Sequence, residues 1–405
     1  MTSTPVAELP AEQLAPRATA ARVLYLDGLR GLAALFVVTY HSASALLPAM
    51  TIGGTSPVHT PVDHFLRSAP ILGLLFKGNS AVCIFFALSG VALSLGPLQK
   101  SNRVAALSAA IRRAPRLMIP ALGATLLSAV LWASGAYHNA QVAHDTSNAW
   151  FTLFWRGDPT WWGPLREATG GVVTTHIPHL YVPVLWTMPW EFLGSMLVFG
   201  VLVIMPPRAV RFVLYAVGIV VFRHSYLVDF VAGMAICDVW LVRGTATRRG
   251  TQLVAAVVGL YGLVLLSCPT PTGNGITFYR WLFPNIGYDI AEQEHLVGAA
   301  LVVAALMALP TAQRALSSRP CRFLGRVSFS LYLLHFLVLG SVGSAVFLLL
   351  HGHTPYAFAA TVATAVIVAV SLAASYLFTV LIDEPGVRQL ARLNRVITRS
   401  LSRAS

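Results

Sequence analysis

Repeated apolar runs of about 20 residues are the feature that most limits how this chain can fold, because a run of that length crosses the hydrocarbon core of a bilayer as an α-helix. Soluble domains carry about 25% charged residues. This chain has 11% charged and 56% hydrophobic residues, and its mean hydropathy is +0.69. The sequence therefore predicts an all-α fold, a polytopic membrane helix bundle of about ten transmembrane helices.

The segments expected to cross the membrane are residues 24–47, 71–97, 117–137, 181–205, 209–222, 225–242, 252–268, 295–311, 324–350 and 357–382. The net charge is +13. With this assignment, 21 of the 28 Lys and Arg residues fall on the side that carries the termini, 6 fall on the other side, and Arg30 lies inside a helix. Because cytoplasmic loops of membrane proteins are enriched in basic residues, we expect cytoplasmic N- and C-termini. The charge then requires no nucleic acid partner.

We expect three parts along the chain: a disordered cytoplasmic tail (1–21), a transmembrane domain (22–386) and a basic cytoplasmic tail (387–405). Residues 98–116 have the pattern of an amphipathic interfacial helix. The long outer loops, 48–70 and 138–180, are the expected acceptor-binding side, because long loops on one face commonly carry recognition.

The cysteines and histidines show no metal-binding pattern. Cys83, Cys237, Cys268 and Cys321 lie in different segments, without the spacing of a disulfide framework or a metal site. The histidines of the two long outer loops form no compact ligand set. We therefore predict no metal.

Two polar residues inside the first apolar segment are candidates for chemistry. Arg30 and His41 are eleven positions apart, about 16 Å along a helix and close to three full turns, so both project from nearly the same face. Asp27, one turn before Arg30, can pair with it. A buried histidine is either a hydrogen-bonded core residue or a general base that takes a proton from a hydroxyl. Both interpretations remain open here.

Two further segments place polar residues on one helical face. In the fourth segment Glu191 is the only acid, and it either bonds a neighbouring helix or orients a base or an acceptor; Trp186 forms part of an aromatic stripe beside it. In the ninth segment Ser328, Tyr332 and His335 share a face and are candidates for a cavity wall.

Arg113 and Arg116 form an R-x-x-R pair directly before the third segment. The pair is either a topology determinant or, together with Arg30, a site for a phosphorylated donor. The planar donor fork of arginine suits phosphate oxygens.

Taken in order, several motifs resemble the acyltransferase-3 family of membrane-bound O-acyltransferases, which modify sugars and some secondary metabolites. The matching pieces are "LDGLRGLAALFVVTYH" (26–41), "FFALSGVALSL" (85–95), "RRAPRLMIP" (112–120), "LWTMPWE" (185–191), "FLGRVSFSLYLLH" (323–335) and "DEP" (383–385). The chain departs from the usual pattern at Met188-Pro189-Trp190 and at Ala87. These departures bear on the identity of the acceptor more than on the type of reaction.

The resemblance implies transfer of an acyl group, commonly acetyl, from cytoplasmic acyl-CoA to an acceptor hydroxyl. It matches Arg30 and His41 to the family's essential first-helix residues, Arg113 and Arg116 to its R-x-x-R pair, and Glu191 to its acid. No permanently bound cofactor is expected; acyl-CoA, in particular acetyl-CoA, is the expected co-substrate.

We expect the acceptor to be a carbohydrate or glycoconjugate hydroxyl, or alternatively a secondary metabolite such as a macrolide or terpenoid. A proton-coupled transporter or flippase that uses His41 and Glu191 as a relay is the non-enzyme alternative. In each case the protein is expected to be a multi-pass integral protein of the plasma membrane or, in a eukaryote, of an endomembrane.

Overall fold

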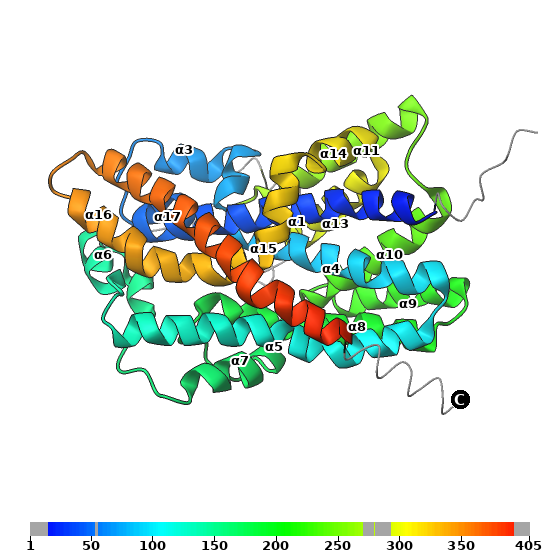
Figure 1. Cartoon of the computed structure of the whole chain (residues 1–405). Coiled ribbons are helices and arrows are strands. Elements are labelled where there is room, and N and C mark those ends of the chain that lie inside the picture. The colour runs from blue at the N-terminus through cyan, green and yellow to red at the C-terminus, as the bar shows by residue number, and fades with distance from the viewer. Residues whose placement is uncertain (1–14, 53–55, 270–278, 280–292, 393–405) are drawn as a thin grey trace, which may run out of the picture.

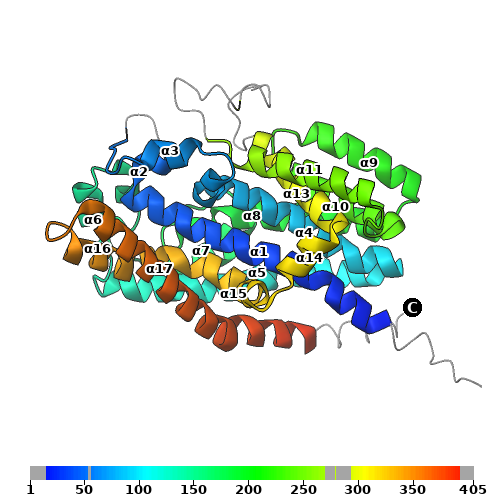
Figure 2. The same ribbon diagram turned by 90° about the horizontal axis from the view of Figure 1, so that it is seen from above.

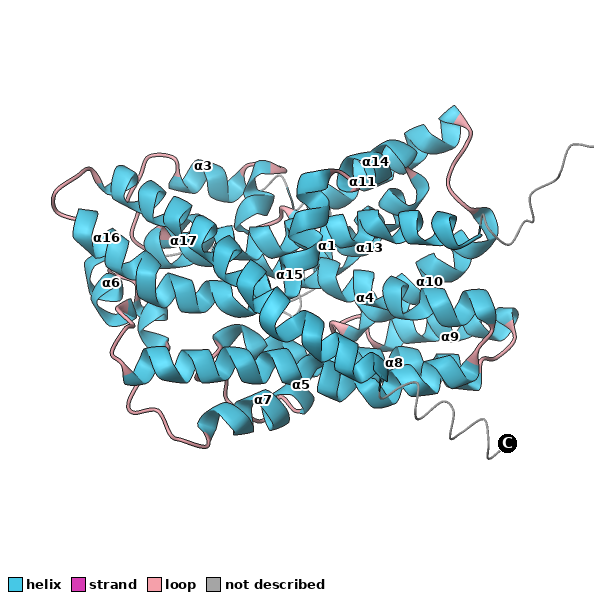
Figure 3. Ribbon diagram, viewed as in Figure 1, coloured by secondary structure: helices cyan, strands magenta, loops and turns pink. Residues whose placement is uncertain are grey.

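The computed structural model describes residues 15–52, 56–269, 279 and 293–392. This part of the chain is a bundle of helices joined by loops, without a β-strand (Figure 3). The all-α prediction is therefore confirmed. Its main helices are α1 (Ala15–Leu46), α4 (Gly78–Lys100), α5 (Arg103–Ala133), α8 (Met188–Ile204), α9 (Arg208–Val221), α10 (Leu227–Arg243), α11 (Arg249–Leu266), α13 (Gln293–Ala308), α15 (Arg319–Val338) and α17 (Tyr356–Phe378).

Shorter elements connect or extend the main helices. Several lie at the end of the bundle away from the first residues of α1: α2 (Pro48–Thr51), α3 (Asp63–Ser68), α6 (Asn139–Asp145), the 3₁₀ turns η2 (Leu72–Phe76) and η3 (Ala149–Leu153), α7 (Gly163–Val173) and α16 (Ser344–Leu350). A 3₁₀ turn, η4 (Pro183–Thr187), leads into α8, and α14 (Pro310–Leu316) follows α13. Two π-helical turns, η5 (Leu339–Gly343) and η6 (Thr379–Asp383), continue α15 and α17 without a break.

Each of the ten predicted segments coincides with a helix, but not every helix is long enough to cross a bilayer alone. Seven helices of the described residues have the length and apolarity of a membrane span, or eight if α13 and α14, bent by 98°, are one span. Helix α9 has 14 residues, which is about 21 Å, shorter than a hydrocarbon core of about 30 Å. The count of ten crossings therefore stays a prediction.

Helix boundaries differ from the predicted ones at two places. Helix α1 begins at Ala15, earlier than the predicted start of the first segment at residue 24; the division of the chain into two tails and a transmembrane domain stays a prediction. Residues 103–133 form one continuous helix, α5, instead of an interfacial helix followed by a separate span. Pro115 and Pro120 lie inside α5, and the helix accommodates both.

The first and last described helices meet at one end of the bundle. Helix α1 starts, and the helix that continues α17 stops, in the right half of Figure 1, where α5 and α9 also begin; α15 begins nearer the middle of the bundle. Seen from above in Figure 2, α1 passes through the middle of the bundle, between α15 and α4. We call this the basic end, because Arg103 and Arg208 open helices there. That it faces the cytoplasm stays a prediction.

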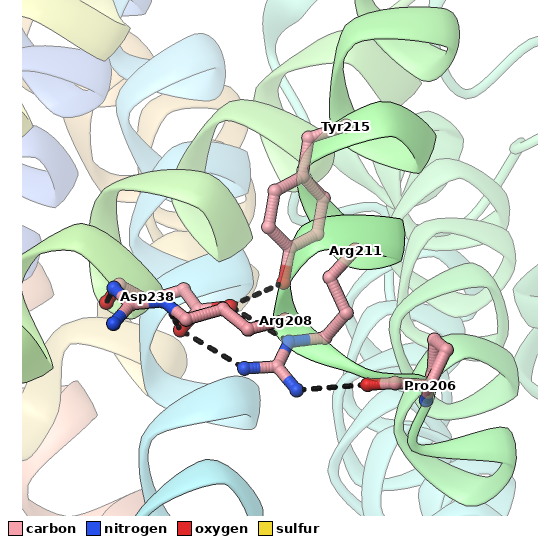
Figure 4. A network of polar contacts seen from close by, with 5 residues as sticks. All are labelled: Pro206, Arg208, Arg211, Tyr215 and Asp238. Carbon is pink, nitrogen blue, oxygen red and sulfur yellow. Dashed lines mark hydrogen bonds and ion pairs between the residues drawn. The ribbon is translucent and has the colours of Figure 1, made fainter.

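Helices α9 and α10 are tied together at the basic end by a buried acid (Figure 4). Asp238 accepts hydrogen bonds from Nε of Arg211 at 2.7 Å and from the hydroxyl of Tyr215 at 3.2 Å. Arg208 donates to the Asp238 carbonyl at 2.7 Å, and Arg211 also donates to the carbonyl of Pro206 at 3.0 Å. This network pairs the buried Asp238 of α10 with two arginines and a tyrosine of α9.

Helices α1 and α15 run parallel and approach so closely that glycine is required. A Cβ added to Gly31 would overlap the backbone nitrogen of Gly325, and one added to Gly325 would overlap the carbonyl of Asp27. Small residues let helix backbones approach in this way. The close pairing aligns Arg30 with Ser328 near the basic end and His41 with His335 farther along.

Replacing Gly31 by alanine is therefore expected to lower stability by at least about 1–3 kcal/mol, as overpacking does, because a backbone must move to admit the methyl group. It is also expected to reduce activity, because it separates His41 from His335. Gly200→Ala in α8 is the control: a Cβ at Gly200 meets nothing within 4 Å, so the melting temperature should hold or rise. Equal melting temperatures for both variants would contradict the prediction.

Candidate active site

A cavity of about 210 Å³ opens among α1, α4, α5, α8 and α15 at the basic end. Its polar lining residues are Arg30, Ser89, Arg113, Arg116, Thr187, Glu191, Arg326, Ser328, Tyr332 and Asp383. Val82, Phe85 and Phe86 of α4 and Leu117 of α5 form part of its apolar wall. Four guanidinium groups line the cavity, and each also pairs with a carboxylate, Arg30 with Asp27 and Arg326 with Glu384 outside the lining. The guanidinium N–H groups that these pairs leave unused are the donors that the cavity offers to an anionic ligand.

The central ion pair of the cavity joins Arg113 of α5 to Glu191 of α8. Both side chains are largely buried, with 15% and 11% of their surface exposed. Ser89 donates to Glu191 Oε1 at 2.7 Å, and Arg113 Nε donates to Ser195 Oγ at 2.7 Å. Glu191 lies in the first turn of α8, whose start is marked by Pro189. The remaining donors of the Arg113 fork are held in a fixed orientation by these contacts.

A second ion pair joins Arg116 to Asp383 at 2.5 Å. Arg116 lies one turn after Arg113 on α5, and Phe329 of α15 lies under its guanidinium at 5.4 Å. Asp383 ends the π-helical turn η6, and Thr379 of the same turn bonds Ser330 of α15 at 2.7 Å. π-Helical turns are frequent at functional sites because they redirect side chains.

Arg30 completes the basic side of the cavity. Its Nε donates to Ser328 Oγ at 3.2 Å, and it also pairs with Asp27 one turn earlier. Its side chain is 44% exposed, so part of its donor fork is open to a ligand.

Tyr332 forms the wall that faces the interior of the bundle. Its hydroxyl donates to the carbonyl of Val184 at 2.9 Å and lies 2.8 Å from the hydroxyl of Thr187. One turn farther along α15, the ring of His335 lies 6.1 Å from that of Tyr332. Tyr332 therefore separates the charged cavity from the histidine.

His335 contacts His41, whose Nδ1 lies 2.8 Å from His335 Nε2. His41 is half-buried and His335 is fully buried. The ring of Trp150 is nearly parallel to that of His41 at 6.2 Å, and Phe336 meets it edge-on at 5.0 Å. His41 does not itself line the cavity formed by the described residues; it lies behind Tyr332 and His335.

A buried acid in the outer loops supports the segment that holds Tyr332. Glu167 of α7 accepts three backbone hydrogen bonds, from Leu180, Tyr181 and Val182, at 2.7 to 2.9 Å. Burial raises the pKa of the Glu167 carboxyl, and the three N–H groups oppose that rise. Nearby, burial lowers the pKa of His179 to about 4. Residues 180–182, which Glu167 anchors, lead directly into η4. That turn supplies Val184 and Thr187, the two residues that the Tyr332 hydroxyl contacts.

Most of the residues singled out from the sequence meet in this region. Six of them line the cavity: Arg30, Arg113, Arg116, Glu191, Ser328 and Tyr332. His41 and His335 contact each other, so there are two imidazoles where one was expected. Trp186 lies elsewhere: it is 38% exposed and packs near Tyr226, with ring centroids 5.8 Å apart.

Several residues of the site carry no clear signal in the sequence. Ser89 and Arg326 line the cavity, although no sequence pattern singles them out. Asp383 lies in the DEP motif, but which arginine it binds depends on the packing of α5 against η6.

Comparison with known proteins gives a consistent result. A family model described as an acyltransferase domain matches residues 23–380. The O-acetyltransferase PaAT-1 of Phomopsis amygdali is 29% identical over 370 residues, covering 79% of this chain and 73% of the relative. A protein named an acyltransferase from a Phoma species is 24% identical, covering 92% of this chain and 96% of its own. The acyltransferase clz18 of Cochliobolus lunatus is 25% identical, covering 80% and 84%. No solved structure matches.

Proposed function

Because the chain belongs to the acyltransferase-3 family and is an acyltransferase, we propose that it moves an acyl group from acyl-CoA to an acceptor hydroxyl within the helix bundle. The predicted alternative of a transporter that is not an enzyme is set aside. The observation that carries the proposal is the arginine-lined cavity, one wall of which contacts a buried histidine pair.

We assign the binding of the acyl donor to the arginines of the cavity. Coenzyme A carries several phosphate charges, and an arginine guanidinium can donate two parallel hydrogen bonds to phosphate oxygens. Arg30, Arg113 and Arg116 come from two helices and line one cavity. The pantetheine arm is about 15–20 Å long, comparable with the rise of about 16 Å from Arg30 to His41 along α1. A nucleotide held at the basic end therefore has the reach to present its thioester at the level of His41. Because Tyr332 closes the cavity on that side, the proposal also requires the Tyr332 side chain to move when the donor binds.

The chemical step is assigned to His41 as a general base. Its imidazole takes the proton of the acceptor hydroxyl while the hydroxyl oxygen attacks the thioester carbonyl carbon. A C–O bond forms, the C–S bond breaks, and the CoA thiolate leaves and takes up the proton from the imidazolium. We propose this direct transfer rather than an acyl-histidine. A stoichiometric burst of CoA release without acceptor would favour the acyl-enzyme.

The acyl group is proposed to be acetyl and the acceptor atom oxygen, in line with the name of the Phomopsis relative. For the acceptor we propose a hydroxyl of a small, largely apolar metabolite, because aromatic rings (Tyr40, Trp150 and Phe336) surround the half-buried His41. A carbohydrate is the second candidate. Exposed indoles at the outer loops, Trp161 (93% exposed) and Trp162 (42%), suit stacking on sugar rings.

Labelled acetyl-CoA added to the purified protein with extracts of host cells tests the reaction. Transfer of label to an extractable ester supports it, and mass spectrometry of wild-type and knockout cells identifies the acceptor by one lost acetyl group. Label that stays on CoA with every extract would refute it.

Arg116→Ala is expected to raise the KM for acetyl-CoA about 10-fold or more, as the loss of a charge-assisted hydrogen bond of about 1.5–3 kcal/mol implies, with a smaller effect on kcat. Arg156→Ala, which removes an exposed arginine of the outer loops, is the matched control and should leave that KM unchanged. Equal donor dependence in the two variants would remove Arg116 from the donor site.

A further inference from the structure

The contact between the two buried imidazoles determines where the protons of the pair lie. We propose that His335 is a positioning residue: it holds His41 in the tautomer with the proton on Nδ1 and the lone pair on Nε2. This inference rests on the proposed function, because it assigns the atom of His41 that takes the acceptor proton. It changes the interpretation of His335, which the sequence placed on a cavity wall.

The proton of His335 is assigned by its own helix. Its Nδ1 lies 3.0 Å from the carbonyl oxygen of Leu331, one turn earlier on α15. A carbonyl oxygen only accepts hydrogen bonds, so Nδ1 of His335 must carry the proton. In a neutral imidazole the other nitrogen, Nε2, then has a lone pair and accepts.

The proton of His41 follows from that assignment. His335 Nε2 is the partner of His41 Nδ1 at 2.8 Å, so His41 Nδ1 must be the donor. The backbone of Val37, one turn earlier on α1, also accepts from the His41 ring. The lone pair of neutral His41 is therefore left on Nε2, the form that a general base requires.

The surroundings favour a neutral pair and a fixed ring orientation. No carboxylate of the described chain forms an ion pair with either histidine. A charge buried without such a partner is costly. The two rings are nearly parallel, 22° apart with centroids 5.0 Å apart, and Phe336 meets both edge-on. These ring contacts hold the plane of the His41 ring, and the hydrogen bond to His335 Nε2 selects the orientation in which Nδ1 faces it.

Glu191 does not perform this positioning role. Its carboxylate is engaged with Arg113 and Ser89 in the charged cavity. A carboxylate often orients a catalytic histidine; in this bundle a second histidine, itself oriented by the Leu331 carbonyl, occupies the corresponding place.

Three substitutions at His335 separate the positioning role from a structural one. Glutamine places an amide oxygen near the former Nε2 and can accept from His41. Asparagine is polar but one methylene shorter, so it cannot reach. Leucine keeps the volume and has no acceptor. With labelled acetyl-CoA and the native acceptor, His335→Leu and His335→Asn are expected to lower kcat about 10- to 100-fold, the range seen when an orienting partner is lost. The KM for acetyl-CoA should stay within about 2-fold, and His335→Gln should keep most of the kcat.

Two controls complete the test. His295→Gln and His295→Leu change another fully buried histidine, on α13, that is bonded to Asn79 and to the Cys268 carbonyl; kcat should be unchanged in the folded variants. In a His41→Ala background, His335→Leu should cause no further loss, because the residue acts through His41. If leucine fails to fold, the comparison between glutamine and asparagine decides.

The outcomes distinguish the two proposals. An active wild type in which glutamine, asparagine and leucine at His335 give equal kcat, or in which the loss adds to that of His41→Ala, overturns the positioning role and leaves acyl transfer intact. A wild type that transfers no acyl group to any acceptor overturns the proposed function itself.

Discussion

Replacing His41 by alanine is expected to lower kcat for acyl transfer about 10²- to 10⁴-fold, the usual contribution of a general base. The KM for acyl-CoA should change little, because the arginines that bind the donor line a cavity from which His41 is separated by Tyr332 and His335. The measurement is steady-state transfer of labelled acetyl groups by purified, folded variant.

The matched control is His41→Gln, which keeps a polar side chain of similar reach but has no basic nitrogen. It should be about as inactive as the alanine variant. Melting temperatures must be compared in parallel, since His41 packs against Trp150 and Phe336. Transfer at the wild-type rate by either folded variant would rule out His41 as the base.

The second large effect is expected at the buried ion pair of the cavity. Removing one partner of such a pair leaves an uncompensated charge and costs about 3–5 kcal/mol. Glu191→Met or Arg113→Met alone should therefore lower the melting temperature sharply. The double variant Arg113→Met/Glu191→Met should recover most of the stability, because two apolar residues of similar volume can replace a buried pair.

Activity should not recover with stability in the double variant. It lacks the Arg113 fork, so its KM for acyl-CoA should stay raised even though the fold is restored. The control is Asp27→Ala, which breaks the ion pair of Arg30. That pair is 44% and 36% exposed, so solvent screening limits the loss to less than about 1 kcal/mol. Wild-type stability in Glu191→Met would contradict the prediction.

The helical architecture was largely predictable because it depends on local pattern. Apolar runs of membrane-spanning length, interrupted by basic loops, identify where each helix lies. The boundaries of α1 and α5 were less predictable. Both helices extend into polar sequence, where hydropathy gives no signal and helix continuity decides.

The candidate site was predictable only in part, and the division has a clear cause. The helical period places Arg30 and His41 on one face, and one turn of α5 separates Arg113 from Arg116, so these pairs follow from sequence spacing. The partners do not. Arg113 meets Glu191 across 78 positions, Arg116 meets Asp383 across 267, and His41 meets His335 across 294.

Sequence alone thus determined which residues this protein places inside the membrane-spanning region: a few arginines, one acid of α8 and the histidines of α1 and α15. Apolar surroundings make each of them conspicuous, because a polar group there is costly unless it is satisfied. Only the tertiary structure decided how they are satisfied. That choice depends on how closely α1 approaches α15 at Gly31 and Gly325, and on which way α5 faces α8. Helix spacing and rotation arise from packing over the whole bundle, which no local pattern encodes.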